Sequence, residues 1–242
     1  MHISVIIPAY NEEQSIRHVI ADIDRDLVSE VIVVDNGSTD RTGEAASASG
    51  ARIIRENRRG YGYACMAGIE AASQCDIAVF LDGDYSDFPD EISRIVSPIL
   101  KDDADLVIGS RVRGSAEKGS LTLPQRFGNF LASFLLNLIF RTDYTDLGPF
   151  RAVKKKSLME LQMKDKKYGW TVEMQIKAAF LGMKVVEVPV SYRKRHAGKS
   201  KVSGTIKGVF LAGIYILYYI MLACFQSILF SNKSSLPGRS DG

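Results

Sequence analysis

Short, largely apolar segments recur along the first half of this chain and alternate with segments of helical periodicity. The apolar segments are residues 3–7, 31–34, 52–54, 77–81 and 106–108, and helical patterns lie at 16–23, 61–72 and 90–100. Strands that are covered on both faces read as continuous apolar runs, and their alternation with helices indicates βαβ units. We therefore expect an α/β fold with a mostly parallel sheet and helices on both faces.

Acidic residues follow two of these predicted strands. Asp35 ends the second strand, and Asp82 and Asp84 come directly after the fourth. Ligands of parallel sheets bind at the carboxyl ends of the strands, and alternate residues leaving a strand point the same way. Asp82 and Asp84 can therefore face one Mg²⁺ or Mn²⁺ ion together with phosphate oxygens; the plainer alternative is a solvated acidic turn. Asp35 can accept hydrogen bonds from a ribose or base, or help to cap the helix that follows.

Motifs that bind phosphate through a glycine-rich loop are absent. The chain has neither G-x-x-x-x-G-K-[ST] nor G-x-G-x-x-G, so bound phosphates must be neutralised by a metal and by basic side chains. The basic candidates are Arg111, Arg126, Arg195 and Lys199, although a solvated surface charge is the plainer interpretation of each alone. The basic run at 151–167 is expected to be a solvated face, and the alternative is a surface that contacts anionic lipid. Three cysteines and three scattered histidines, His2, His18 and His196, indicate no disulfide framework, metal site or catalytic triad.

The longest apolar run lies near the C-terminus. Residues 209–230 carry no charge, and about 20 helical residues suffice to cross a bilayer. Residues 1–187 hold 23 basic and 27 acidic residues, net −4, whereas residues 188–242 hold 8 basic residues and one acidic residue, net +7. Because most basic residues precede the run, the positive-inside rule places residues 1–207 in the cytoplasm. We expect a domain at 1–207, a single transmembrane helix at 208–231 and a polar tail at 232–242, with no signal peptide; the alternative is a buried core helix.

A second apolar stripe is shorter. Apolar side chains recur at helical spacing over residues 127–140, and only Asn129, Ser133 and Asn137 form a narrow polar seam. Fourteen residues are too few to span a bilayer. The segment is expected to be a core helix or, over 125–141, an amphipathic helix in the membrane interface.

An ordered set of motifs resembles one known family. VIIPAYNEE, VVDNGSTDRT, GYGYACMAGI and LDGD are followed by IGSR at 108–111, TDLGPFRA at 145–152, GWTVEMQIKA at 169–178 and VPVSYRKRHAGKSK at 188–201. Together they resemble the family 2 glycosyltransferases of GT-A fold, in particular the dolichyl- and polyprenyl-phosphate mannosyl- and glucosyltransferases. The resemblance covers about residues 3–207, and it implies a GT-A catalytic domain.

The resemblance also implies roles for particular positions. The residues implied at the nucleotide sugar are Pro8, Tyr10, Glu12, Asp35, Asp82, Lys199 and Ser200. Asp82 and Asp84 are implied as metal ligands, and Arg111 and Arg126 as the basic groups that meet an acceptor phosphate. Asp146 matches an acid near the reacting sugar, and Arg195 matches a loop that closes over the diphosphate.

The implied activity is inverting sugar transfer from a nucleotide sugar, of the GDP-mannose or UDP-glucose type, to a membrane polyprenyl phosphate such as dolichyl or undecaprenyl phosphate. The implied partners are Mg²⁺ or Mn²⁺, the donor, the lipid acceptor and the membrane, with no nucleic acid. Departures at 85–89 and at 148–150 leave the nucleotide and sugar open. The alternatives are transfer to a hydroxyl with Asp146 as base, a nucleotidyltransferase, and a non-catalytic membrane adaptor.

Overall fold

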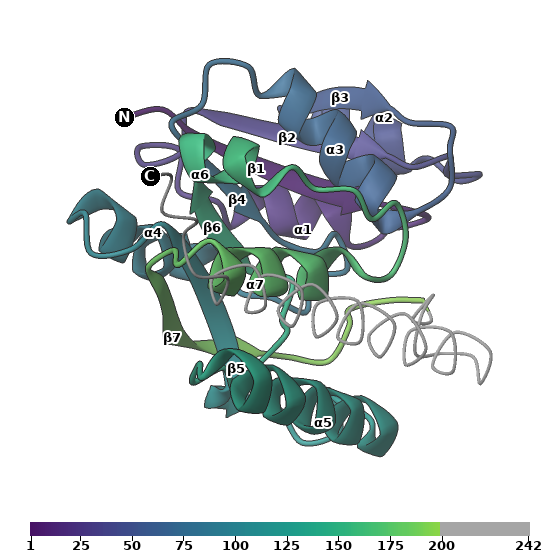
Figure 1. The fold of residues 1–242 in the computed structure, drawn as a ribbon. Coiled ribbons are helices and arrows are strands. Elements are labelled where there is room, and N and C mark those ends of the chain that lie inside the picture. Colours follow the sequence, from purple (N-terminus) through teal and green to yellow (C-terminus); the bar gives the residue numbers. More distant parts are fainter. Residues whose placement is uncertain (199–242) are drawn as a thin grey trace, which may run out of the picture.

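The computed structural model describes residues 1–198, which form a seven-stranded sheet with helices on both faces (Figure 1). The strand order is β3-β2-β1-β4-β6-β5-β7. Within residues 1–198, β6 alone runs against the others. The strands are β1 Ile3–Ala9, β2 Glu30–Asp35, β3 Arg52–Arg55, β4 Ile77–Phe80, β5 Leu106–Ala116, β6 Arg151–Lys154 and β7 Val185–Tyr192. The expected α/β fold with a mostly parallel sheet is confirmed.

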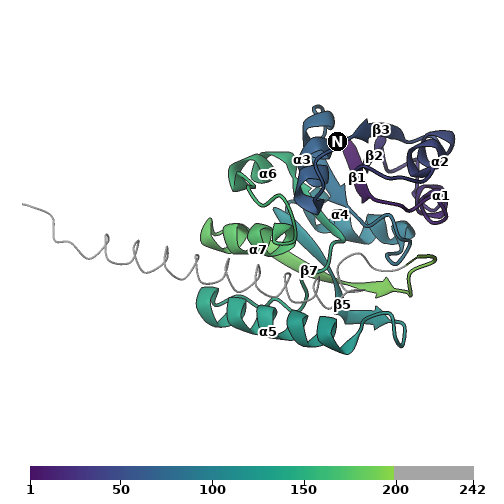
Figure 2. The same ribbon diagram turned by 90° about the vertical axis from the view of Figure 1, so that its right-hand side faces the viewer.

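The helices divide between the two faces of the sheet (Figure 2). They are α1 Ile16–Ala21, α2 Thr42–Ala48, α3 Tyr61–Ala71, α4 Ile92–Leu100, α5 Leu123–Phe140, α6 Lys155–Leu161 and α7 Trp170–Phe180, with a 3₁₀ turn at Pro89–Glu91. Val5 and Ile7 of β1 pack with α1, α2 and α4, whereas Ile6 packs with α3, α6 and α7. Because successive strand residues point to opposite faces, a strand with apolar residues at every position supplies both cores.

The reversal of β6 decides what meets at one edge of the sheet. Strands β1, β2, β4, β5 and β7 all end at the same edge, because they are parallel. Strand β6 is antiparallel to β4 and β5, so it begins at that edge. Residues 141–150, which have no helix or strand of their own, are therefore delivered beside the carboxyl ends of the other strands.

The expectation of a solvated basic face at 151–167 is wrong at Arg151, the first residue of β6, whereas Lys156, Lys164, Lys166 and Lys167 are exposed. Arg151, at its start, is fully buried, and its guanidinium donates to the carbonyls of Leu147, Gly148 and Thr171. Burial lowers the pKa of Arg151 to about 10. The Arg151 side chain therefore holds the loop that precedes β6 through hydrogen bonds to its carbonyl groups.

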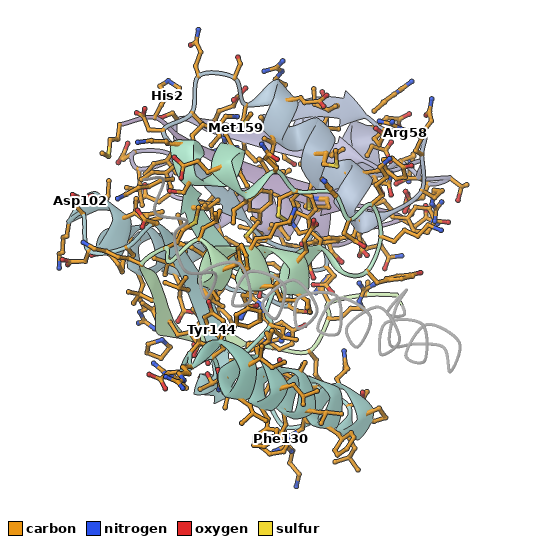
Figure 3. The ribbon with its side chains drawn as sticks, viewed as in Figure 1. His2, Arg58, Asp102, Phe130, Tyr144 and Met159 are labelled. Carbon is orange, nitrogen blue, oxygen red and sulfur yellow. The ribbon has the colours of Figure 1, made fainter. Side chains whose placement is uncertain are left out.

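Helix α5 carries its polar seam on the inner side. Asn129 donates to the Thr145 carbonyl and Asn137 to the Tyr144 carbonyl, and Ser133 is buried. Leu123, Phe127, Phe130, Phe134 and Leu138 are between 52% and 79% exposed, and Phe130 projects away from the rest of the protein (Figure 3). The apolar stripe thus lies outward, which removes the core-helix alternative for these side chains.

Two predicted segments fall beyond this description. The expected transmembrane helix at 208–231 and the polar tail at 232–242 lie outside the described residues. Among residues 1–198, no helix has the length and apolar character needed to cross a bilayer.

Two helical glycines should respond in opposite ways to replacement by alanine. A Cβ at Gly68 of α3 would lie 2.3 Å from Cγ2 of Ile6, whereas a Cβ at Gly128 of α5 would meet nothing within 4 Å. Overpacking costs about 1–3 kcal/mol, and alanine favours a helix over glycine by roughly 0.5–1 kcal/mol. We expect Gly68→Ala to lower the denaturant midpoint and Gly128→Ala to raise it; equal shifts would contradict the close packing of α3 on β1.

Candidate active site

The edge where the parallel strands end gathers six of the charged residues that the sequence singled out. Asp35 ends β2, Asp82 and Asp84 follow β4, Arg111 lies in β5 and Arg195 follows β7. Asp146 reaches the same edge from the loop before β6. The strand polarity described above accounts for this convergence.

Arg195 links two acids that are far from it in sequence. Its Nη2 lies 3.0 Å from Oε1 of Glu12 and 2.9 Å from Oδ2 of Asp84. Burial opposes the guanidinium charge, but attraction by Asp84 and Glu12 outweighs it and raises the pKa of Arg195. Three of the predicted residues therefore form one ion-pair cluster.

A third acid joins Asp82 and Asp84 at the end of β4. Asp87 is buried; one of its oxygens accepts the Asp82 backbone N–H at 3.2 Å, and its Oδ1 has no partner in the described part of the chain. Desolvation, followed by repulsion from Asp84, raises the pKa of Asp87 to about 7. Desolvation and repulsion from Asp84 and Asp87 also raise the pKa of Asp82 well above its ordinary value.

These carboxyls suit a divalent cation. Crowded carboxylates whose repulsion raises their pKa values are relieved by a hard cation, and Mg²⁺ and Mn²⁺ prefer oxygen ligands. Within residues 1–198, no three acidic, histidine or cysteine side chains are already gathered closely enough to hold a metal among themselves. The donor chemistry therefore fits a metal that is held by two protein carboxylates and completed by other oxygens.

Arg111 and Asp146 form a second, buried ion pair. The Asp146 carboxylate, which is fully buried, accepts from the backbone N–H, Nε and Nη2 of Arg111 at 2.8, 2.8 and 2.6 Å. Although burial disfavours the guanidinium charge, the Asp146 carboxylate raises the pKa of Arg111. The Arg111 Nη1 group has no acceptor among the described residues. Both oxygens of Asp146 are thus engaged, and the largely buried Arg111 guanidinium also lies 5.0 Å from the centre of the Tyr192 ring.

Residues expected at the nucleotide lie together around the ends of β1 and β2. Pro8 is opposite Val34 and Ala9 is opposite Asp35 in the β1–β2 register. The Arg59 guanidinium lies 3.2 Å from the centre of the Tyr10 ring. Asp35 accepts from the Ser38 N–H at 2.9 Å, whereas Asp40 accepts from the N–H of Thr42 at the start of α2. The side chain that accepts a hydrogen bond from the first turn of α2 is therefore that of Asp40 rather than that of Asp35.

Three predicted residues are not part of these clusters. Arg126 lies in the first turns of α5, where it is exposed, and its guanidinium has no hydrogen-bond or ionic partner within residues 1–198. Lys199 and Ser200 lie outside the described residues.

The segment after β7 crosses the acidic loop, and sequence reasoning missed this contact. The backbone N–H groups of Arg193 and His196 donate to the carbonyls of Ser86 and Asp84. The Arg193 guanidinium lies 3.5 Å from the centre of the ring of Tyr85, whose φ of 64° is left-handed. Left-handed backbone at a non-glycine residue persists where the surroundings hold it.

The same crossing brings together two histidines that looked scattered in the sequence. The His18 and His196 ring centres are 4.8 Å apart, and both rings lie near Tyr85. Because only the fold brings α1 beside residue 196, no local sequence pattern predicts the contact between His18 and His196. Asp87 did carry a signal, since it lies three residues after Asp84 on the same turn.

Comparison with known proteins identifies the family to which this site belongs. Residues 4–162, more than half of the chain, match glycosyl transferase family 2. The chain belongs to glycosyl transferase family 2. It is 36% identical over 208 residues to a dolichyl-phosphate hexose transferase of Haloferax volcanii, covering 83% of this chain and 86% of the relative. It is 31% identical over 222 residues to an undecaprenyl-phosphate mannosyltransferase of Micrococcus luteus, covering 86% and 90%.

A solved structure agrees with this assignment. Glucosyl-3-phosphoglycerate synthase from Mycobacterium tuberculosis, in complex with Mn²⁺, uridine diphosphate and glucosyl-3-phosphoglycerate, superposes with a TM-score of 0.74 at 25% identity. The match covers 92% of this chain and 80% of the synthase. This family 2 glycosyltransferase therefore has a GT-A-like fold, as its motifs implied.

The raised pKa of Asp87 predicts a change in the pH dependence of stability. Because the folded state holds this proton up to about pH 7 and the unfolded chain releases it near pH 4, stability falls as pH rises through that window. In Asp87→Asn this loss is absent. Thermal unfolding is measured in buffer that contains a chelator. Between pH 5 and pH 8, the Tm of the variant should rise by a few degrees relative to the Tm of the wild type, at about 2–4 °C per kcal/mol of stability. Parallel pH curves would contradict the assignment.

Proposed function

We propose that this glycosyltransferase moves a sugar from a nucleoside diphosphate donor to the phosphate of a membrane polyprenol, with inversion at the anomeric carbon. The names of the Haloferax and Micrococcus relatives support a polyprenyl-phosphate acceptor. The observation that carries the proposal is that α5 turns its polar side chains toward the protein and its large apolar side chains outward. Its asparagines hold the loop that bears Asp146, and its aromatic face lies outward.

On the donor side, Asp82 and Asp84 would hold a divalent metal, which when bound supplies positive charge to the leaving diphosphate. Binding of Mn²⁺ and uridine diphosphate by the structural relative supports this assignment. Arg195, now paired with Asp84 and Glu12, would turn to the diphosphate and stabilise the charge that develops there. Pro8, Tyr10, Glu12, Asp35, Lys199 and Ser200 complete the proposed nucleotide-sugar site.

On the acceptor side, the geometry favours a phosphate over a hydroxyl. A hydroxyl nucleophile needs a general base within hydrogen-bond reach, but both oxygens of the buried Asp146 already accept from Arg111. A phosphate is anionic at neutral pH and needs positioning rather than deprotonation. The unpaired Nη1 of Arg111 and the exposed guanidinium of Arg126 are suited to receive it.

The outer face of α5 is proposed to lie in the membrane interface. Five large apolar side chains are exposed along one helix, with Arg126 near its start and Arg141 at its end. Apolar side chains flanked by basic ones are typical of helices that rest at the level of the lipid headgroups. An acceptor with its phosphate at that level would meet Arg126 and Arg111, and the proposed helix at 208–231 would keep the domain on the cytoplasmic face.

An experiment can distinguish two other acceptors from the polyprenyl phosphate. One is a hydroxyl of a glycan or glycolipid, and the other is a small soluble acid such as the phosphoglyceric acid of the structural relative. The full chain in membranes is incubated with radiolabelled GDP- and UDP-sugars, and with each acceptor in turn. We expect label in a lipid that mild acid releases. Acid-stable lipid label, or water-soluble label that depends on phosphoglycerate, would overturn the proposal.

Loss of either metal carboxylate should stop transfer. We expect Asp82→Asn and Asp84→Asn to lower turnover at least about 100-fold, the scale for lost electrostatic stabilisation of a transition state. Mn²⁺ binding in the presence of the nucleotide, measured by electron paramagnetic resonance, should be lost in parallel. Asp90→Asn, an exposed acid on the following 3₁₀ turn, is the matched control. Full wild-type activity in EDTA would contradict the metal assignment.

Removal of Arg126 should affect the lipid acceptor alone. We expect Arg126→Ala to lower kcat/KM for polyprenyl phosphate about tenfold or more while the Kd of the nucleotide sugar stays unchanged. Arg17→Ala, at an exposed arginine of α1 that the proposal does not use, is the control. Unchanged turnover in Arg126→Ala would remove this residue from the acceptor site.

A further inference from the structure

A closed ring of polar contacts joins β5, β7 and the loop that bears Asp146. Ser110 Oγ of β5 lies 2.7 Å from Thr145 Oγ1, which lies 2.6 Å from Oε2 of Glu187 on β7. The Arg113 backbone N–H donates to Ser110 Oγ at 3.0 Å, and the Arg113 Nε lies 3.2 Å from the same Glu187 oxygen. The Ser110 and Glu187 side chains are buried, Thr145 is half-buried, and the Arg113 side chain is 43% exposed.

The direction of every hydrogen bond in this ring is fixed. An ionised carboxylate only accepts, whereas each hydroxyl has a single proton to donate. Thr145 must therefore donate to Glu187, and Ser110 must donate to Thr145. The Ser110 oxygen in turn accepts from the Arg113 N–H. The ring thus has one arrangement of protons, and losing the Thr145 hydroxyl breaks it at its centre.

Glu187 of the ring and Gln175, which lies outside it, hold the backbone of Asp146 from both sides. The second Glu187 oxygen, Oε1, accepts the N–H of Thr145 at 2.7 Å and that of Asp146 at 3.2 Å. Gln175 of α7 donates to the Asp146 carbonyl at 3.1 Å. Residues 141–150 have no helix or strand, so these side chains replace the backbone pairing that would otherwise fix the loop.

We propose that Ser110, Thr145 and Glu187 are positioning residues that set the Arg111 guanidinium for the acceptor phosphate. They act through Asp146, whose carboxylate takes three hydrogen bonds from Arg111. A displacement of about 1 Å in a positioned group can cost on the order of 100-fold in rate. The inference rests on the proposed function, since it names the residues behind the proposed acceptor-phosphate group.

The test uses a substitution that removes the hydroxyl and little else. Thr145→Val keeps the branched shape and the backbone N–H, whereas Thr145→Ser keeps the hydroxyl. In the full chain with polyprenyl phosphate, we expect Thr145→Val to lower kcat/KM for the acceptor at least tenfold. The Kd of the nucleotide sugar should stay within twofold of the wild-type value, and Thr145→Ser should stay within about threefold of wild-type kcat/KM.

Amide hydrogen exchange of residues 143–148 provides a readout that needs no acceptor. We expect the Asp146 amide to lose protection in Thr145→Val and to keep it in Thr145→Ser. Ser115→Ala, which removes another hydroxyl contact between β5 and β7, should change neither measurement.

Two results would overturn the positioning role. One is wild-type acceptor kinetics in Thr145→Val, and the other is an equal loss of acceptor kcat/KM and donor affinity. A wild-type protein that labels no polyprenyl phosphate would instead overturn the proposed function, and the exchange comparison would still decide whether the ring holds the loop.

Discussion

The buried ion pair between Arg111 and Asp146 is the contact on which the candidate site depends. Asp146 is fully buried, and its carboxylate is balanced by three donors of Arg111. Removing one member of such a pair leaves an uncompensated charge and typically costs about 3–5 kcal/mol. The pair exists because β6 runs against its neighbours and begins at the edge where β5 carries Arg111.

Two centres of opposite charge then face the same edge of the sheet. The acids after β4 are the proposed cation-binding centre, where Arg195 supplies the positive charge in this structure. The Arg111–Asp146 pair is the proposed anion-binding centre, because Nη1 of Arg111 has no acceptor within residues 1–198. The proposed reaction, in which a sugar leaves a diphosphate at the first centre and joins a phosphate at the second, needs this division of charge. It also explains why the protein holds residues 141–150 with side chains of β5, α5, α7 and β7.

The local sequence was sufficient to predict a structural feature where a single residue type determines that feature. Continuous apolar strands predicted the mostly parallel sheet, and acids after β2 and β4 predicted its charged edge. Strand β6 escaped prediction because it has four residues and is bounded by Arg151 and Lys154, and basic residues read as surface. Arg151 is buried because backbone carbonyls surround its guanidinium, and this surrounding forms only in the tertiary structure. The Ser110–Thr145–Glu187 ring and the His18–His196 contact also join distant segments, so no spacing rule could find them.

A double-mutant cycle tests the central claim, which is that Asp146 acts through Arg111 on an anionic acceptor. Acceptor kcat/KM is measured for the wild type, Arg111→Gln, Asp146→Asn and the double variant. If the two residues act as one unit, the double variant loses no more activity than Arg111→Gln alone. If the two single losses multiply instead, Asp146 has a role of its own, such as that of a base for a hydroxyl acceptor, and the account is contradicted.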